Sequence, residues 1–187
     1  MGDLLTRGLD AALSAGAGYA DARLLTVDTE FLAARRGQVA AVHRDEETGL
    51  SLRVLVDGAW GFAATADLSA DGVARAATSA VANARETAGL RLEPVELAPE
   101  PTLIATWDTP YRRDPASVPL TEKLDLLVEV VRRMEEHPGV AVADAMMDFR
   151  TERQRQLTSE GSDLTQTLRF AGVGMGATSV GPGGVQR

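Results

Sequence analysis

The chain has 187 residues, of which 44% are hydrophobic and 25% are charged, so it can fold around a sizeable core. Its net charge of −8 and the scarcity of clustered Lys and Arg argue against a nucleic-acid-binding surface. The sequence has no cysteine, its first residues lack the apolar core of a signal peptide, and no apolar run approaches a membrane span. We therefore expect a cytoplasmic protein that binds neither nucleic acid nor membranes.

The first residues predict a short amphipathic helix followed by strands. Leucines and alanines recur at helical spacing behind Asp3, a candidate N-cap, and the segment ends at Gly16 and Gly18. Runs rich in β-formers then predict an antiparallel meander. Its strands are expected at Tyr19–Val27, Glu30–Arg36 and Gln38–Asp45, with a polar loop at Asp45–Gly49.

The stretch from Thr48 to Asp67 predicts a β-hairpin. Apolar residues alternate with polar ones, as in a strand with one buried face. They are Leu50, Leu52, Val54 and Val56. The dipeptide Asp57-Gly58 favours a two-residue turn, and the second strand carries Trp60 and Phe62. We expect these two aromatic side chains to be buried, Trp60 beneath an alanine-rich helix that follows Ser69 and ends at Gly89.

The second half predicts an extended segment, a helix and more strands. Six of the eight prolines lie between residues 90 and 119, where Trp107 and Tyr111 are expected to hold the segment against a folded surface. From Leu120 the apolar residues follow a helical period as far as His137-Pro138-Gly139. Strands are then expected at Val140–Arg150, Arg153–Ser159 and Leu164–Ala171, with a turn at Glu160–Asp163.

These elements predict an α+β fold, with an antiparallel or mixed sheet of hairpins packed by amphipathic helices. We divide the chain into an N-terminal domain at 1–89, a proline-rich crossing segment at 90–119, and the incomplete start of a second domain at 120–187. The order of helix and strands occurs twice, with Tyr19-Ala20-Asp21-Ala22 beside Val142-Ala143-Asp144-Ala145. This similarity indicates a degenerate helix-plus-strands repeat.

No catalytic, cofactor-binding or metal-binding residue is predicted within these 187 residues. His43 and His137 do not form the i, i+4 pair that holds zinc on one helix face, and His137 ends a helix, where a positive charge is favourable. The run Gly172–Ala177 fits a G-x-G-x-x-A pattern after a strand, but the residues that follow cannot readily begin a helix. We interpret this run instead as small residues in a strand, which allow another part of the molecule to pack closely against it.

Two blocks of sequence resemble a known family. LSLRVLVDGAWGFAATADLS at 50–69, with its alanine-rich helix, resembles the N-terminal domain of the TldD/PmbA proteins. VPLTEKLDLLVEVVRRMEEHPGVAVADA and LTSEGSDLTQ resemble the region that follows, and Gly-Phe-Ala-Ala-Thr and Ser-Glu-Gly-Ser are closer to the TldD type. This resemblance implies a zinc metallopeptidase, of a family once called modulators of DNA gyrase. It also implies peptide or unfolded polypeptide as substrate, and a homodimer or a heterodimer with a TldD/PmbA-type subunit.

The resemblance implies that the zinc site lies outside this chain. The family binds zinc through a His-Glu-x-x-x-His helix and a cysteine further along, and this sequence has neither, so no zinc is expected in the chain itself. We expect an N-terminal portion of a peptidase, inactive alone, that shapes the peptide cleft and the subunit interface. The alternative is a non-catalytic module that binds a peptide or partner at an open sheet edge, and the Gly172–Gly184 region is expected to leave such an edge.

Overall fold

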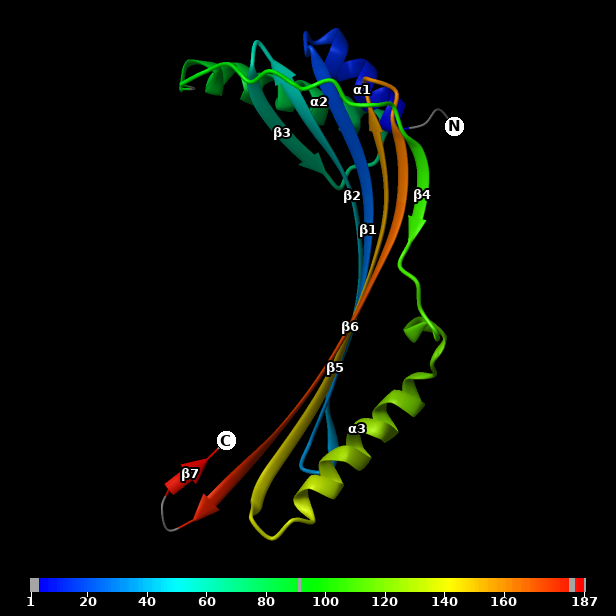
Figure 1. Ribbon diagram of the computed structural model, residues 1–187, viewed down its shortest axis with the longest axis vertical. Coiled ribbons are helices and arrows are strands. Elements are labelled where there is room, and N and C mark those ends of the chain that lie inside the picture. Colours follow the sequence, from blue (N-terminus) through cyan, green and yellow to red (C-terminus); the bar gives the residue numbers. More distant parts are fainter. Residues whose placement is uncertain (1–3, 91, 182–183, 187) are drawn as a thin grey trace. The chain divides into compact units, whose positions relative to one another are not determined.

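The computed structural model describes residues 4–90, 92–181 and 184–186 (Figure 1). Its α-helices are α1 (Leu4–Ser14), α2 (Ala70–Thr87) and α3 (Leu120–Glu135), with short 3-10 helices η1 (Ala88–Leu90) and η2 (Pro115–Ser117). Its strands are β1 (Tyr19–Arg35), β2 (Gln38–Val56), β3 (Ala59–Thr65), β4 (Ile104–Asp108), β5 (Val140–Thr158), β6 (Asp163–Gly181) and β7 (Gly184–Gln186). The predicted N-cap Asp3 lies outside the described residues. None of the helices described is long and apolar enough to span a membrane.

The described strands form one seven-stranded sheet in the order β3-β2-β1-β5-β6-β4, and β7 pairs with β6. β2 and β3 pair antiparallel, as do β6 and β7, whereas β4 runs parallel to β6. The predicted α+β class with a mixed sheet is therefore confirmed. β4 was not predicted, because the prolines around it indicate an extended segment without saying what it pairs with.

Three predicted interruptions are wrong. β1 continues through residues 28 and 29, β2 continues through the expected loop at Asp45–Gly49, and β5 continues through residues 151 and 152. These stretches are polar, which resembles a loop in sequence, but none contains a proline and only Gly49 is a glycine. Their backbone groups pair with neighbouring strands, so charged side chains are no obstacle to a strand.

The chain divides into two compact units. Unit 1 holds the described residues up to Thr26, together with Glu47–Asp108 and Glu152–Thr167. Unit 2 holds Val27–Glu46, Thr109–Thr151 and the described residues from Leu168 on. The strands β1, β2, β5 and β6 supply residues to both units. The domain boundaries predicted at residues 89 and 119 divide the chain into continuous segments, whereas each compact unit combines several separate stretches. These boundaries stay a prediction.

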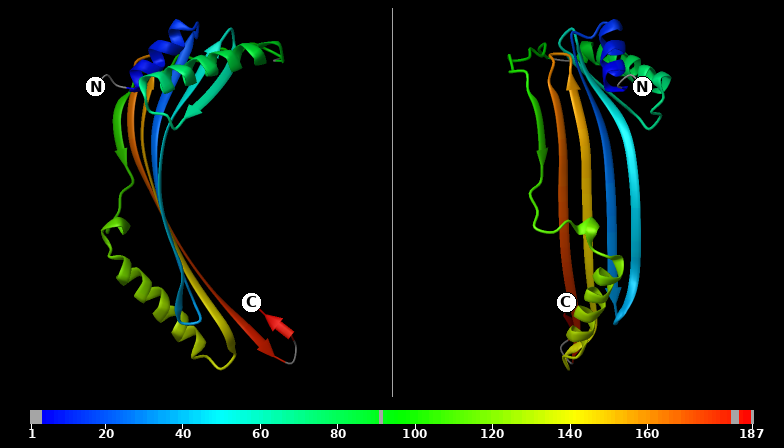
Figure 2. Two further views of the ribbon diagram at one scale, coloured as in Figure 1. Left: turned by 180° about the vertical axis from the view of Figure 1, so that it is seen from behind. Right: turned by 90° about the vertical axis from the view of Figure 1, so that its right-hand side faces the viewer.

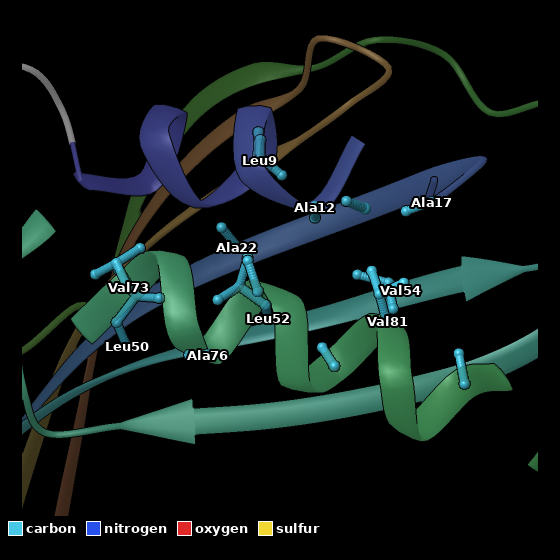
Figure 3. Close-up of a cluster of buried hydrophobic side chains, with 14 of the residues drawn as sticks. Leu9, Ala12, Ala17, Ala22, Leu50, Leu52, Val54, Val73, Ala76 and Val81 are labelled. Atoms are coloured by element: carbon cyan, nitrogen blue, oxygen red, sulfur yellow. The ribbon is translucent and has the colours of Figure 1, made fainter. Parts of the chain in front are cut away.

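In unit 1, α1 and α2 pack on one face of the β-strands. Figure 3 shows Leu50, Leu52 and Val54 of β2 beneath α2, with Val73 and Val81 reaching down to them. The predicted N-cap of α2 is confirmed, because the Ser69 hydroxyl accepts a hydrogen bond of 3.0 Å from the Gly72 N–H. The turn between β2 and β3 has positive φ at Asp57 and Gly58, as a two-residue hairpin turn requires.

Gly61 allows α2 to lie directly on β3. A methyl group at this position would overlap the carbonyl oxygen of Ala80 and lie 2.6 Å from the backbone nitrogen of Ala84. Both of these atoms belong to the helix backbone, so no side-chain rotation could relieve the overlap. The alanine-rich face of α2 and the missing side chain at Gly61 together set the distance between helix and strand.

Gly61→Ala should therefore lower the free energy of unfolding by about 3 kcal/mol, since an inserted methyl group must displace backbone atoms. Gly89→Ala is the matched control, because nothing lies within 4 Å of an added methyl group there. Its effect should stay within about 0.5 kcal/mol. Urea unfolding of the two variants measures both values, and equal midpoints would contradict the close approach of α2.

In unit 2, α3 covers β1 and β5. Its residues Leu127 and Val131 are buried against small and aliphatic side chains of the two strands, which are Leu32, Ala34, Ala143 and Ala145. Further along the chain, the Arg169 guanidinium lies 4.6 Å from the ring of Tyr111, and the Arg169 N–H donates to the Thr109 hydroxyl at 3.1 Å. Tyr111 therefore contacts a strand, as predicted for the proline-rich segment.

Each unit contains a helix followed by a strand that the helix covers. Residues 15–18 separate α1 from β1, and residues 136–139 separate α3 from β5. Ala20 and Ala22 pack in the cluster that contains α1, and Ala143 and Ala145 pack in the cluster that contains α3. This arrangement agrees with the helix-plus-strands repeat indicated by the sequence.

A buried ion pair joins α3 to β1. Lys123 is only 5% exposed, and its ammonium group pairs with the Glu30 carboxylate and lies 4.6 Å from the ring of Phe149. Arg44 of β2 also pairs with Glu30. Burial alone would raise the pKa of Glu30, but the hydrogen bonds from Lys123 and Arg44 outweigh it and lower that pKa.

Glu30→Gln should lower the free energy of unfolding by about 3 kcal/mol, because it leaves the Lys123 ammonium buried without a countercharge. Arg44→Ala is the control, since its half-exposed side chain should contribute less than about 1 kcal/mol. Chemical unfolding at neutral pH measures both. A loss no greater than that of Arg44→Ala would contradict the burial of this pair.

The same variant has a defined pH dependence. The folded-state pKa of Glu30 lies below its ordinary value of 4.5, so its stabilisation is complete above that pH and is lost as the pH falls through the lowered pKa. The difference in stability between the wild type and Glu30→Gln should therefore narrow in acid. A difference that is constant from neutral pH down to the lowered pKa would show that ionisation of Glu30 is not its source.

Candidate functional site

The helix-free face of unit 1 carries a group of aromatic and charged side chains that we call the aromatic cluster. It consists of Tyr19, Asp21, Arg53, Trp60 and Phe62. The hairpin register pairs Leu55 with Trp60 and Arg53 with Phe62. Because alternate residues of a strand point to opposite faces, and Val54 and Gly61 face α2, this cluster points away from the helix.

The register corrects the prediction that Trp60 and Phe62 are buried. Trp60 is only partly buried and lies on the face opposite α2, and Phe62 is 58% exposed. Burial in unit 1 comes instead from aliphatic side chains and alanines. The two-residue turn contains enough information to place Trp60, since pairing Val56 with Ala59 puts it beside Leu55 on the face of Arg53.

Arg53 is the centre of the aromatic cluster. Its guanidinium pairs with one carboxylate oxygen of Asp21, at 2.7 Å from Nη2 and 2.8 Å from Nε. It also lies 4.7 Å from the ring centre of Trp60. Tyr19 packs edge-on against Trp60, with ring centres 5.9 Å apart at 88°. Asp21 is only 5% exposed, so Arg53 neutralises a buried carboxylate and holds the indole in place.

The electrostatics of the aromatic cluster favour binding over acid–base catalysis. Burial and then the nearby Asp21 charge raise the pKa of Tyr19, so its phenol remains protonated at neutral pH. Burial would lower the pKa of Arg53, but its hydrogen bond and charge interaction with Asp21 prevail and raise it. Neither group can change its protonation state near pH 7. The cluster offers an exposed aromatic ring beside a fixed positive charge, which suits a contact surface.

Trp60→Ala should lower the free energy of unfolding by about 1 to 2 kcal/mol, less than the 3 to 5 kcal/mol typical of a fully buried aromatic side chain. The substitution removes the contacts of the partly buried indole with Tyr19 and Arg53, but it leaves the core beneath α2 unchanged. Phe62→Ala should change stability by less than about 0.5 kcal/mol, because its ring is mostly exposed. Denaturant melts test both, and a full core-sized loss for Trp60→Ala would place the indole inside.

The other residues considered from sequence do not come together as a site. His43 lies exposed on β2, and His137 follows α3, where its Nδ1 accepts a hydrogen bond of 3.3 Å from the Gly139 N–H. Gly172–Ala177 lies inside β6 and continues as a strand, so the nucleotide-binding pattern lacks its helix. Within the described ranges, no three His, Cys, Asp or Glu side chains form a group that could hold a metal ion. These residues therefore do not fit a zinc site.

Sequence comparison identifies a family for part of the chain. Residues 20–84, which run from the start of β1 into α2 and include most of the aromatic cluster, match the family described as PmbA/TldA metallopeptidase domain 1. No curated protein matches the chain.

Solved structures share the fold over almost the whole chain. A protein named as a modulator of DNA gyrase from Bacteroides thetaiotaomicron superposes on 97% of this chain with a TM-score of 0.75 and 18% identity. A protein of the same description from Thermotoga maritima covers 94% with a TM-score of 0.68 and 15% identity. TldE from Thermococcus kodakarensis covers 99% with a TM-score of 0.64 and 16% identity. The matches take up 41%, 39% and 41% of those chains, so this chain spans about two fifths of their length.

The family match and the shared fold agree with the resemblance found in the sequence. The matched residues hold the hairpin, the Asp57-Gly58 turn and the alanine-rich helix on which that resemblance was based. Residues 20–84 of this chain therefore match the first domain of the PmbA/TldA metallopeptidase family, and the chain shares the fold of these relatives.

Proposed function

We propose that this chain is the N-terminal portion of a TldD/PmbA-type zinc metallopeptidase whose zinc motif lies outside these residues. The observation that carries the proposal is the match of residues 20–84 to the first domain of a metallopeptidase family. The shared fold with proteins more than twice as long supports a role as one part of a larger enzyme. Zinc supplies a Lewis acid and an activated water molecule to such peptidases.

In this proposal, the aromatic cluster contacts the polypeptide substrate. Phe62 and the partly exposed Trp60 offer apolar contacts, and the Arg53 guanidinium beside them offers hydrogen-bond donors. The strong pairing of Arg53 with Asp21 fixes these groups before any ligand arrives, which limits the entropy lost on binding. Other parts of the chain would contribute to the interface of a homodimer or heterodimer, in the cytoplasm.

The test compares the 187-residue chain with the complete product of its reading frame. We expect the complete product to hold about one zinc ion per chain and to hydrolyse an unfolded polypeptide such as casein. The 187-residue chain should do neither. Metal analysis by mass spectrometry and a peptidase assay with and without a chelator give both answers. A complete product without zinc or peptidase activity would refute the proposal, and so would zinc-dependent hydrolysis by the 187-residue chain.

The role of the aromatic cluster is tested in the same assay. Phe62→Ser should raise KM severalfold with little change in kcat, since an exposed side chain that only binds contributes equally to ground and transition states. Leu13→Ser is the control, because Leu13 is similarly exposed on α1 and lies outside the cluster. Equal KM values for the two variants would remove the cluster from the substrate path.

A further inference from the structure

The segment between α2 and β4 is tied to unit 1 at two turns. Near its start, the Val95 N–H donates to the Gly58 carbonyl of the β2–β3 turn at 2.9 Å, and a methyl group on Gly58 would lie only 2.7 Å from Pro94 Cβ. Near its end, the Thr102 hydroxyl donates to the Glu160 carbonyl of the β5–β6 turn at 2.9 Å. Figure 1 shows the segment crossing the ends of the strands between these turns. The right-hand view of Figure 2 shows it and the helices α1 and α2 on opposite sides of the strands.

The part between the two ties, Glu96–Pro101, is longer than the distance that it spans, and we call it the strap. The strand order β3-β2-β1-β5-β6 places the two turns three strand spacings apart, which is about 14 Å. The seven residue steps from Val95 to Thr102 can reach about 22 Å in a proline-rich extended chain. The strap is exposed, and none of its residues has a hydrogen bond or ion pair within the part of the chain that the structure describes. It therefore has slack to bend over the sheet.

The charges of the strap and of the aromatic cluster are complementary. The strap carries the carboxylates of Glu96 and Glu100 and has no basic residue. Arg53 is 51% exposed, and its pairing with Asp21 uses Nε and Nη2 of a group with five N–H donors, so it can also donate to a second carboxylate. Arg23 lies two positions from Asp21 on the same face of β1 and adds a second guanidinium beside the cluster. This part of the face therefore attracts an acidic segment.

The tie at Gly58 holds the start of the strap beside the aromatic cluster. Trp60 follows Gly58 by two residues, and the Arg53 guanidinium lies 4.7 Å from the centre of its ring, on the side chain's way toward the turn. Glu96 directly follows the residue that is bonded to Gly58. A bend of several ångströms can therefore bring the Glu96 carboxylate to Arg53 and the Leu97 side chain to the exposed part of the indole.

We propose that the strap bends over the aromatic cluster and pairs Glu96 with Arg53, so that a polypeptide substrate must displace it. This inference rests on the proposed function of the cluster and adds a means of regulating it. Because the strap is tied at both ends, it competes at a high effective concentration, so a weak ion pair is enough to keep a measurable fraction of the molecules closed. Salt should open the strap, since the pair forms at the surface.

The first test detects closure without any hydrolysis. Trp107→Phe leaves Trp60 as the only tryptophan of the 187-residue chain, and acrylamide quenches its fluorescence according to its exposure. Adding Glu96→Gln should raise the quenching constant by a factor of about two at low salt, because the open strap no longer shields the indole. Glu86→Gln makes the same charge change at an exposed position of α2 and should leave the constant unchanged. In about 1 M sodium chloride, all three proteins should give the same high constant.

The second test uses hydrolysis of casein by the complete product of the reading frame. Glu96→Gln should lower KM by a factor of about two to three with kcat unchanged, since the strap blocks binding and leaves the chemistry alone. Deletion of residues 98 and 99 should have the same effect, because the remaining five steps reach only about 16 Å and leave almost no slack. Combining the two changes should lower KM no further. Glu86→Gln is again the control.

The outcomes separate this inference from the proposed function. If the complete product hydrolyses casein with zinc, but Glu96→Gln and Glu86→Gln have equal KM values, the strap inference is wrong and the proposed function stands. If the complete product has neither zinc nor activity, the proposed function is wrong, and the quenching constants alone decide whether the strap closes. Equal quenching constants for Glu96→Gln and Glu86→Gln at low salt would overturn the inference in either case.

Discussion

The alternation of side chains along the strands determines which residues face the helices and which face away from them. In unit 1, even positions of β2 from Leu50 to Val56 face α2, so Arg53 must face the other way. A shift of one residue in the pairing of β2 and β3 would move Trp60 under the helix and place Gly61 outside. The backbone of α2 at Ala80 and Ala84 leaves no room for a side chain at the place that Gly61 now occupies, so Trp60 cannot take that place and the shifted register cannot form. The same register of β2 and β3 therefore places Gly61 under α2 and the aromatic cluster on the opposite face.

The same rule divides β5 in unit 2. Ala143 and Ala145 lie under α3, and the residues between and after them, Asp144 and Met146, extend over glycines of β6. A strand with bulky residues in place of these glycines could not accommodate the carboxylates at this position. The glycine run is therefore explained by its neighbours across the sheet, as expected for small residues that something approaches closely.

Local patterns in the sequence were enough to predict the helices, the hairpin turn and the fold class. The N-cap at Ser69, the turn at Asp57-Gly58 and the end of α3 before His137-Pro138-Gly139 each depend on a few adjacent residues. The continuity of the long strands could not be predicted in this way. A polar stretch such as Asp45–Gly49 becomes a strand only because β1 pairs with it, and pairing partners are not visible in a single sequence.

The ion pairs between residues far apart in the sequence were missed for the same reason. Arg53 and Asp21 are 32 positions apart, and Lys123 and Glu30 are 93 positions apart. Composition shows only that arginines and carboxylates are present in the chain. The hairpin register alone places Trp60 on the face of Arg53. That Asp21 lies beside Arg53 is known only from the structure. The second pair depends on how α3 meets β1, for which the helix sequence alone gives no information.

The aromatic cluster is held in one arrangement by its own ion pair. The aromatic cluster presents side chains that are already fixed by an ion pair, so it can select for the side chains of a ligand.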